Sequence, residues 1–228
     1  MKQLFERLEI HGIETREIWD IGAYKGEWTL EIANYVPKAK FTLFEPNSIH
    51  NFHLNKTNAR IMNVLLSDQN GESLFYSHGG TGDSLFPEYN EDLVKRSAYR
   101  IEKCVRIDTL IEKSQNLIVP DFVKIDVQGA ELNVLKGAGK YLFEIKVILL
   151  ECPIVHYNWG SPNIHDYLSF MYKSNFVPYF ITEIHRLNEI ITQIDIAFIQ
   201  KKTFDQKVIS LAKSGFWTSN EDRYLHSM

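Results

Sequence analysis

The chain has 228 residues, which is enough for one well-buried α/β domain or two small ones. A charged fraction of 24% and an apolar fraction of 44% are typical of a soluble globular protein and exclude a disordered or fibrous chain. The net charge of −4 gives no basic surface in the average, so we expect no nucleic-acid partner. We see no membrane-spanning apolar run and no secretory signal, so we expect a cytoplasmic protein.

The first strand and the turn after it organise the chain. Residues 17–21 form an apolar run suited to a buried strand, and Gly22 and Gly26 bracket the turn that follows. Apolar side chains then recur at helical spacing until Pro37 ends the helix. Such a unit points backbone N–H groups and a positive helix end at a ligand, and Glu45 closes the next strand, where a carboxylate can accept ribose hydroxyls. The stretch predicts a nucleoside-cofactor site; an ordinary α/β turn is the alternative.

The remaining pattern predicts further alternation of strands and helices. We expect helices at 48–56, from 108, over 130–138 and at 164–173, and strands at 41–44, 60–66, 72–77, 102–107, 122–126, 145–150, 177–182 and 193–199. The last two strands are separated by a polar segment, which we interpret as a connection. Residues 1–16 form a lead-in, 17–202 one domain and 203–228 a tail.

Right-handed crossovers between these elements should give a mostly parallel, doubly wound sheet. Ligands of such sheets bind beyond the carboxyl ends of the strands, near the switch in strand order. The residues at those ends are mostly acidic and predict a site: Asp20, Gly22, Glu45, Ser67, Asp68, Asp126 and Glu151.

The charges at this edge favour one cofactor over another. A dinucleotide needs a Gly-x-Gly-x-x-Gly turn, but Asp20 stands where the first glycine would be and would repel a pyrophosphate. S-adenosylmethionine has no phosphate and carries a sulfonium and an ammonium, which suit an aspartate near the methionine part and Glu45 on the ribose. The comparison favours S-adenosylmethionine and leaves an NAD(P)-dependent oxidoreductase as the alternative.

Three motifs resemble the FkbM-type family of S-adenosylmethionine-dependent methyltransferases. They are residues 20–26 (Asp-Ile-Gly-Ala-Tyr-Lys-Gly), 44–47 (Phe-Glu-Pro-Asn) and 123–131 (Val-Lys-Ile-Asp-Val-Gln-Gly-Ala-Glu), and the resemblance spans roughly 17–200. It implies the Rossmann-like class I methyltransferase fold, with seven strands and a reversed C-terminal hairpin. It also implies O-methylation of a hydroxyl, often on a saccharide or another small metabolite.

Candidate site residues follow from the strand ends and these motifs. For cofactor binding they are Asp20, Gly22, Ala23, Tyr24, Gly26, Trp28, Glu45, Pro46, Asn47, Ser67, Asp68, Ser84 and Asp126. For catalysis they are Asp126, Glu131, Glu151 and His156, which are candidates to take the acceptor's proton or to orient the acceptor. Glu131 has a second interpretation, as an acidic residue that only stabilises the start of its helix.

Several alternatives stay open at this stage. Asp126, Glu131 and Glu151 are oxygen ligands for Mg²⁺ if the reaction requires a divalent ion; otherwise we expect no metal. Residues 78–84, rich in glycine, are interpreted as a flap over the ligand or as a plain surface loop. The expected partner is a small-molecule or glycan hydroxyl, and a homodimer and a non-catalytic cofactor-binding module of the same fold are both left open.

Overall fold

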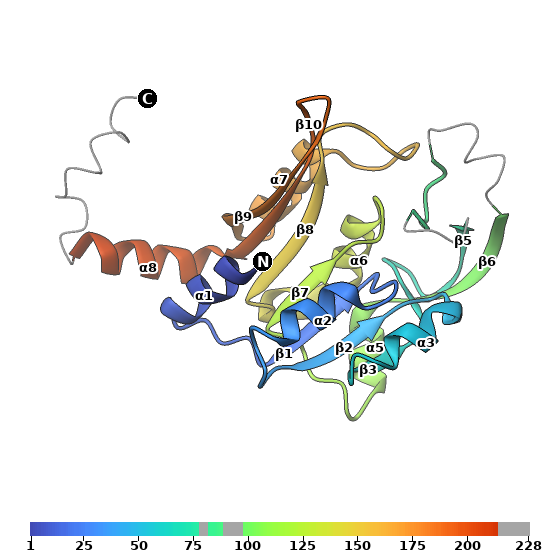
Figure 1. The fold of residues 1–228 in the computed structure, drawn as a ribbon, viewed down its shortest axis with the longest axis horizontal. Helices are drawn as coiled ribbons and strands as arrows, with labels where there is room; N and C mark the ends of the chain where they lie inside the picture. Colours follow the sequence, from blue (N-terminus) through green and yellow to red (C-terminus); the bar gives the residue numbers. More distant parts are fainter. Residues whose placement is uncertain (78–81, 89–97, 214–228) are drawn as a thin grey trace.

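The protein is built on a seven-stranded sheet (Figure 1). A computed structural model describes residues 1–77, 82–88 and 98–213. The strand order is β3-β2-β1-β7-β8-β10-β9, and the first five of these strands are parallel, whereas β10 is antiparallel to both β8 and β9. The strands are β1 (Glu17–Ile21), β2 (Lys40–Phe44), β3 (Arg60–Met62), β7 (Phe122–Ile125), β8 (Val147–Pro153), β9 (Phe176–Leu187) and β10 (Ile190–Gln200). The predicted doubly wound sheet with a reversed C-terminal hairpin is confirmed.

Helices cover both faces of this sheet (Figure 1). They are α1 (Lys2–Ile10), α2 (Glu27–Ala33), α3 (Asn51–Leu54), α5 (Ile107–Lys113), α6 (Glu131–Gly137), α7 (Ile164–Lys173) and α8 (Lys201–Lys213), with 3₁₀ turns η1 (Ser48–His50) and η2 (Gly139–Glu144). Alternate residues of each central strand serve the two sides: Phe122 packs with α1 and α2, whereas Val123 and Ile125 pack with α5, α6 and α7. The sheet is therefore buried between two apolar cores.

A second, three-stranded sheet lies beside the first and was not predicted as a separate unit. Its order is β4-β6-β5, from β4 (Leu65–Leu66), β5 (Gly71–Ser77) and β6 (Ala98–Val105). The single strand expected at 60–66 is thus wrong, because the chain breaks at Asn63, whose side-chain amide donates to the backbone oxygen of Glu45 at 2.8 Å. Residues before the break pair with β2, and residues after it pair with β6.

The C-terminal hairpin is longer than the sequence pattern indicates. β9 and β10 pair from Phe176 to Gln200, and their turn has positive φ at Asn188 (47°) and Glu189 (68°), as two-residue hairpin turns require. The polar segment expected to be a loop is therefore strand. Much of it lies on an exposed part of the hairpin, so its residues did not show the apolar alternation of a half-buried strand.

The ends of the domain are helical. α1 occupies most of the predicted lead-in, and α8 begins at Lys201, so the boundary expected after residue 202 falls inside a helix. Residues 214–228, most of the expected tail, lie outside the described residues. In the part of the chain that the structure describes, no helix is both long enough and apolar enough to cross a membrane.

Candidate active site

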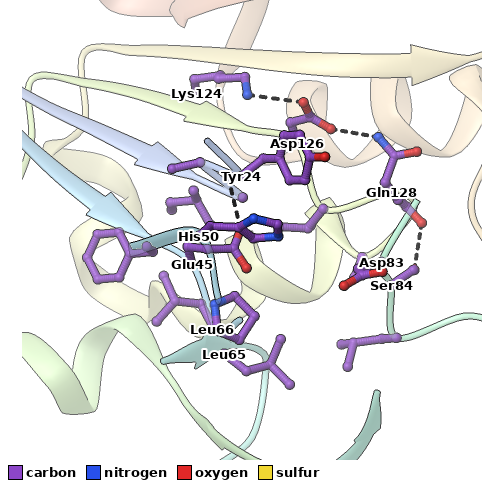
Figure 2. A pocket seen from close by; sticks show the side chains of 18 of the residues that line it. Tyr24, Glu45, His50, Leu65, Leu66, Asp83, Ser84, Lys124, Asp126 and Gln128 are labelled. Carbon is purple, nitrogen blue, oxygen red and sulfur yellow. Dashed lines mark hydrogen bonds and ion pairs between the residues drawn. The ribbon is translucent and has the colours of Figure 1, made fainter. Parts of the chain in front are cut away.

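A cavity of about 360 Å³ opens at the carboxyl ends of the central strands (Figure 2). Its volume lies in the range of small-molecule sites. Five stretches supply the wall: the turn after β1, Glu45 with Pro46, the segment 64–66, the segment 83–85, and the end of β7 through Gln128; Glu151 of β8 completes it. This is where the strand order reverses between β1 and β7, as the sequence predicts.

Gly22 allows the turn after β1 to approach the end of β7. Its φ is +80°, and a Cβ at this position would lie 1.8 Å from the backbone oxygen of Asp126. No other residue type fits there, because the backbone conformation and the space both exclude a side chain. The turn continues through Ala23 and Tyr24, which line the cavity, to Gly26, which lies outside it against Thr57.

Glu45 holds this turn in place and still faces the cavity. One carboxylate oxygen accepts the backbone N–H of Tyr24 at 2.9 Å, and the other accepts that of Asn47 at 2.8 Å. Each oxygen has a second lone pair for a ligand hydroxyl. Burial raises the pKa of Glu45 to about 7, although these two backbone hydrogen bonds oppose the shift. Pro46 lines the cavity beside Glu45, whereas Asn47 does not.

The apolar wall comes from the segment just before Ser67 and Asp68, two of the candidate cofactor-binding residues. Val64, Leu65 and Leu66 line the cavity, but Ser67 and Asp68 do not. The Ser67 hydroxyl instead donates to Asp68 at 3.2 Å, and the backbone oxygen of Asp68 accepts from Arg106 at 2.6 Å. The structure thus places these two polar residues outside the cavity, directly after the end of β4.

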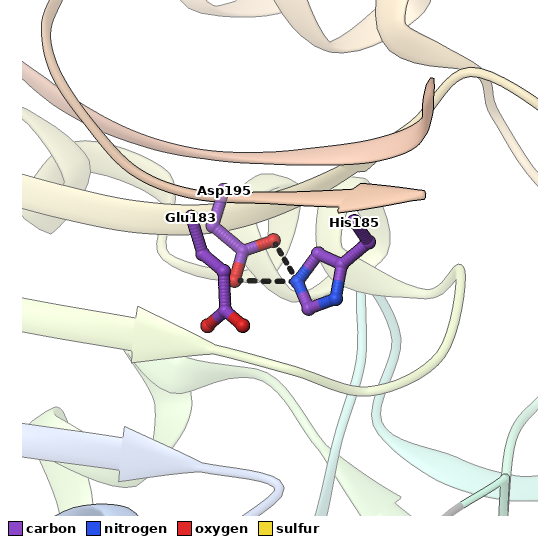
Figure 3. A group of neighbouring side chains, drawn as sticks. All are labelled: Glu183, His185 and Asp195. Atoms are coloured by element: carbon purple, nitrogen blue, oxygen red, sulfur yellow. Dashed lines mark hydrogen bonds and ion pairs between the residues drawn. The ribbon is translucent and has the colours of Figure 1, made fainter. Parts of the chain in front are cut away.

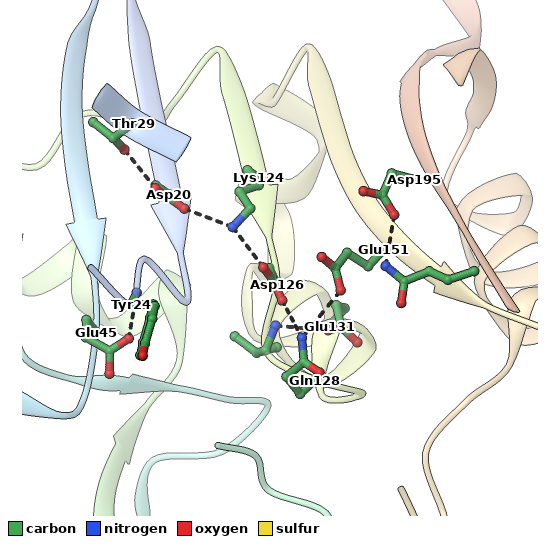
Figure 4. A network of polar contacts seen from close by, with 12 residues as sticks. Asp20, Tyr24, Thr29, Glu45, Lys124, Asp126, Gln128, Glu131, Glu151 and Asp195 are labelled. Carbon is green, nitrogen blue, oxygen red and sulfur yellow. Dashed lines mark hydrogen bonds and ion pairs between the residues drawn. The ribbon is translucent and has the colours of Figure 1, made fainter. Parts of the chain in front are cut away.

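A chain of charged groups runs beneath the cavity (Figure 4). The ammonium of Lys124 lies 3.1 Å from Asp126 and 3.5 Å from the fully buried Asp20, which also accepts the hydroxyl of Thr29 at 2.7 Å. Although burial lowers the pKa of Lys124, the carboxylates of Asp126, Asp20 and Glu151 raise it above its ordinary value, so the lysine stays charged. Asp126, Lys124 and Trp28 line the cavity, whereas Asp20 supports it from below.

The Gln128 turn after β7 is fixed from two other segments. Gln128 has a φ of +55°, and its backbone oxygen accepts both the Ser84 hydroxyl at 2.7 Å and the Asn158 side-chain amide at 2.6 Å. Its own amide donates to Asp126 at 2.7 Å. Ser84, a candidate cofactor-binding residue, is buried and lines the cavity. Of the expected flap at 78–84, residues 78–81 lie outside the described residues.

Glu151 also lines the cavity, where its carboxyl group lies near that of Asp126. Its one described side-chain hydrogen bond is a long one, 3.4 Å from the amide of Gln128. Burial, together with the nearby carboxylates of Asp126 and Asp195, raises the pKa of Glu151 to about 9 against the opposing charge of Lys124.

The other two catalytic candidates lie elsewhere. Glu131 is buried on the opposite face of the sheet, where it accepts the backbone N–H groups of Val127 at 3.0 Å and Gly129 at 3.1 Å and the hydroxyl of Tyr167. These contacts hold the turn after β7. His156 is exposed, does not line the cavity, and contacts the backbone oxygen of Ser161 at 3.1 Å. The structure therefore brings Asp126 and Glu151 together on the wall of the main cavity, whereas Glu131 shares only a small neighbouring cavity with Glu151 and His156 lines neither.

Several residues of the cavity wall were not predicted. Lys124 lies two residues before Asp126 in the same strand, a spacing that places both on one face and could have identified it. His50 stacks edge-on against Tyr24, with ring centroids 4.4 Å apart, and closes another side. Asn158, which fixes the Gln128 turn from outside the cavity, had no local signal, because its partner Gln128 is 30 residues away in the sequence.

The fold and the cavity together define a class. The sheet has seven strands, one of which is reversed, and the cavity has an acidic residue, Glu45, at the end of β2. This is the arrangement of class I S-adenosylmethionine-dependent methyltransferases. The family model described as "Methyltransferase FkbM domain" matches residues 20–180. The chain belongs to this FkbM methyltransferase family, so the resemblance found in its motifs is confirmed, and an NAD(P)-dependent oxidoreductase is disfavoured.

The chain is similar to solved methyltransferase structures, one of which reaches a TM-score that supports the fold. A magnesium protoporphyrin IX methyltransferase from Synechocystis PCC 6803 with bound SAM has a TM-score of 0.50 at 8% identity, covering 87% of this chain and 77% of that one. TrmK from M. capricolum, in complex with S-adenosyl-homocysteine, has a TM-score of 0.48 at 11% identity, covering 86% and 68%. At these identities the likeness concerns the fold alone. Comparison with curated proteins found no match.

Proposed function

We propose that the chain methylates a hydroxyl oxygen of a saccharide, a glycan intermediate or another small metabolite in the cytoplasm. The observation that carries this proposal is the pair of carboxyl groups, Asp126 and Glu151, at one end of the cavity. Among the described residues, Asp126 has a lysine ion pair within 4 Å and Glu151 has none. Two carboxyl groups in such different environments suit two different tasks.

The cavity residues fit S-adenosylmethionine. Glu45 keeps free lone pairs for the ribose hydroxyls, Leu65 and Leu66 offer an apolar surface to a base, and Asp126 offers a negative charge to the ammonium of the methionine part. When bound, the cofactor supplies a methyl group on a sulfonium, which is a good leaving group. The chain must then align the acceptor and remove its proton.

Glu151 is the residue best placed to take that proton. Asp126 is held by Lys124 at 3.1 Å and by the Gln128 amide at 2.7 Å, and these contacts stabilise it as a charged, fixed group. Glu151 has only one long contact, at 3.4 Å, and its raised pKa of about 9 makes its ionised form a strong base for a hydroxyl proton, so we expect turnover to rise with pH up to about 9. In this assignment Asp126 binds and orients, and Glu151 is the general base.

The loop after β8 offers a surface for a sugar ring. Tyr157 and Trp159 are 44% and 56% exposed, close in sequence to Asn158, which bonds the Gln128 turn at 2.6 Å. Aromatic faces of this kind pack against the apolar face of a saccharide. Their position on either side of Asn158, which bonds the cavity residue Gln128, supports a glycan or another ring-bearing acceptor.

A pair of charge-removing substitutions tests the division of tasks. We expect Glu151→Gln to lower kcat about 10²- to 10⁴-fold with little change in cofactor affinity, because a general base contributes roughly that factor. We expect Asp126→Asn to weaken both S-adenosylmethionine binding, measured by calorimetry, and turnover, measured as release of the demethylated cofactor. Wild-type kcat in Glu151→Gln would remove it from the chemistry and leave Asp126 as the base.

A further inference from the structure

The C-terminal hairpin carries a group of potential metal ligands outside the cavity. Glu183 and His185 on β9 and Asp195 on β10 bring their ligand atoms within 4.8 Å of one another (Figure 3). Among the described residues this is the one such set of three, whereas the predicted set of Asp126, Glu131 and Glu151 does not converge; the carboxylate of Glu131 instead accepts from Val127, Gly129 and Tyr167.

Strand pairing fixes these three side chains on one face. Asp195 is directly opposite Glu183, and His185 lies two residues beyond Glu183 in the same strand, opposite Gln193. Residues with this spacing and pairing point to the same side of a sheet. In Figure 3 the three side chains leave the hairpin in one direction and approach one another.

The distances within the group match a coordination shell better than a hydrogen bond. Nε2 of His185 lies 3.4 Å from both carboxylate oxygens of Asp195, which is longer than an ordinary N–H···O hydrogen bond and shared equally between the two. Two ligand atoms bound tetrahedrally at about 2.1 Å from one ion lie roughly 3.4 Å apart. The imidazole and the carboxylate are thus already spaced as two ligands of one ion.

The surroundings of the group also favour a cation. Two carboxylates, Glu183 and Asp195, face each other, and among the described residues neither has an ion pair with a lysine or arginine within 4 Å. The Gln193 amide donates to Asp195 at 3.0 Å and orients its carboxylate, as outer-sphere partners of metal ligands do. Because Glu183 is exposed, the group opens to solvent on one side.

We propose that Glu183, His185 and Asp195 bind a divalent transition-metal ion, with Zn²⁺ the best fit. One imidazole and two carboxylates are ligands that zinc accepts, and three protein ligands leave a fourth position for water or another oxygen. Asp195 is the strand partner of Glu151, which lines the cavity (Figure 4). If the proposed function holds, an ion held by Asp195 would therefore lie one strand away from the proposed base, Glu151.

Metal binding alone tests the site, without cofactor or acceptor. The full chain, free of tags and stripped of metal, is titrated with Zn²⁺, Mn²⁺ and Mg²⁺ by calorimetry. We expect one tight equivalent of Zn²⁺, weaker Mn²⁺ and the weakest binding for Mg²⁺, in line with the general order of divalent affinities for mixed nitrogen and oxygen ligands. Absence of a tight Zn²⁺ equivalent in the wild type would overturn the assignment, whatever the fate of the methyltransferase proposal.

Substitutions of the three proposed ligands test whether these residues bind the ion. We expect His185→Ala and Asp195→Asn each to weaken Zn²⁺ at least about 100-fold, because loss of a ligand should cost no less than loss of an outer-sphere partner. Glu183→Gln, at an exposed position that should tolerate the change, guards against misfolding of the other two. His165→Ala removes an exposed histidine of α7 and should leave affinity unchanged. Unchanged affinity in all three ligand variants would place the ion elsewhere.

Discussion

Single residues of this site serve the fold and the ligand in opposite ways, and Glu45 is the clearest case. It anchors the turn after β1 through two backbone hydrogen bonds, yet burial makes its charged form costly. Its folded-state pKa of about 7 exceeds the ordinary value of 4.5, so the folded protein binds more protons between these values than the unfolded chain. The contribution of Glu45 to stability is therefore largest at low pH and falls as the pH rises through this window.

Glu45→Gln separates these two effects. We expect the melting temperature of the apo wild type, relative to that of the variant, to fall between pH 5 and pH 8, because only the wild type ionises a buried carboxyl group in this range. We expect S-adenosylmethionine to bind roughly 10- to 150-fold more weakly, since charge-assisted hydrogen bonds contribute about 1.5–3 kcal/mol. Wild-type affinity should also fall from pH 8 to pH 6, and the variant should lose this dependence. Equal affinities of the two proteins at pH 8 would remove Glu45 from the binding site.

The charged residues of the site could be predicted in part, and strand geometry explains the rest. Asp126 and Glu151 were found because both end apolar runs. Ser67 and Asp68 were expected at the site, but the cavity is lined by the three residues before them. The sequence gives no sign that the chain passes from one sheet to the other at Asn63. Glu131 was ambiguous from sequence, since only the fold shows which side of the sheet it faces and that Tyr167 donates to it.

At the scale of elements, the site depends on how closely the turn after β1 meets the end of β7. Gly22 and the backbone of Asp126 are in contact there, and Gly160 in the loop after β8 provides a matched comparison. Both glycines have nearly the same φ, +80° and +79°. A Cβ at Gly160 would meet only ring atoms of Phe86 at 3.8 Å, which is ordinary contact.

Gly22→Ala and Gly160→Ala should therefore differ in stability although their backbone strain is alike. We expect Gly160→Ala to lower the free energy of unfolding by about 1–3 kcal/mol, the cost of a non-glycine residue at positive φ. Gly22→Ala adds a clash with the backbone of Asp126, so we expect a loss above about 4 kcal/mol. Urea unfolding measures both. Similar losses in the two variants would show that the strands do not meet as closely as the structure has them.

The C-terminal hairpin is a second element whose structure differs from the sequence prediction. The sequence predicts two short strands with a polar connection, because Glu183, His185 and Arg186 interrupt the apolar pattern. The structure pairs these residues along the extended β9 and β10. Their pairing depends on cross-strand partners about ten residues away and on the turn at Asn188, so the group of metal ligands could not be predicted from local pattern alone.

For the whole molecule, the order of elements was enough to predict the main sheet. Parallel strands joined by helices leave few arrangements, and the reversed hairpin followed from the family resemblance. The small β4-β6-β5 sheet was missed, because β4 has only two residues and pairs with a strand about forty positions later. It nevertheless shapes the site, since Leu65 and Leu66 of β4 line the cavity.

Transfer of a methyl group to a hydroxyl oxygen is tested most directly by identifying the atom that receives it. The full chain is incubated with S-adenosylmethionine carrying a carbon-13 methyl group and with a panel of saccharides and small hydroxyl compounds, and the products are analysed by NMR. We expect a labelled methyl ether in at least one acceptor and none with Glu151→Gln. A labelled methyl group found only on nitrogen or carbon, or in no compound while the cofactor binds, would contradict the proposed reaction.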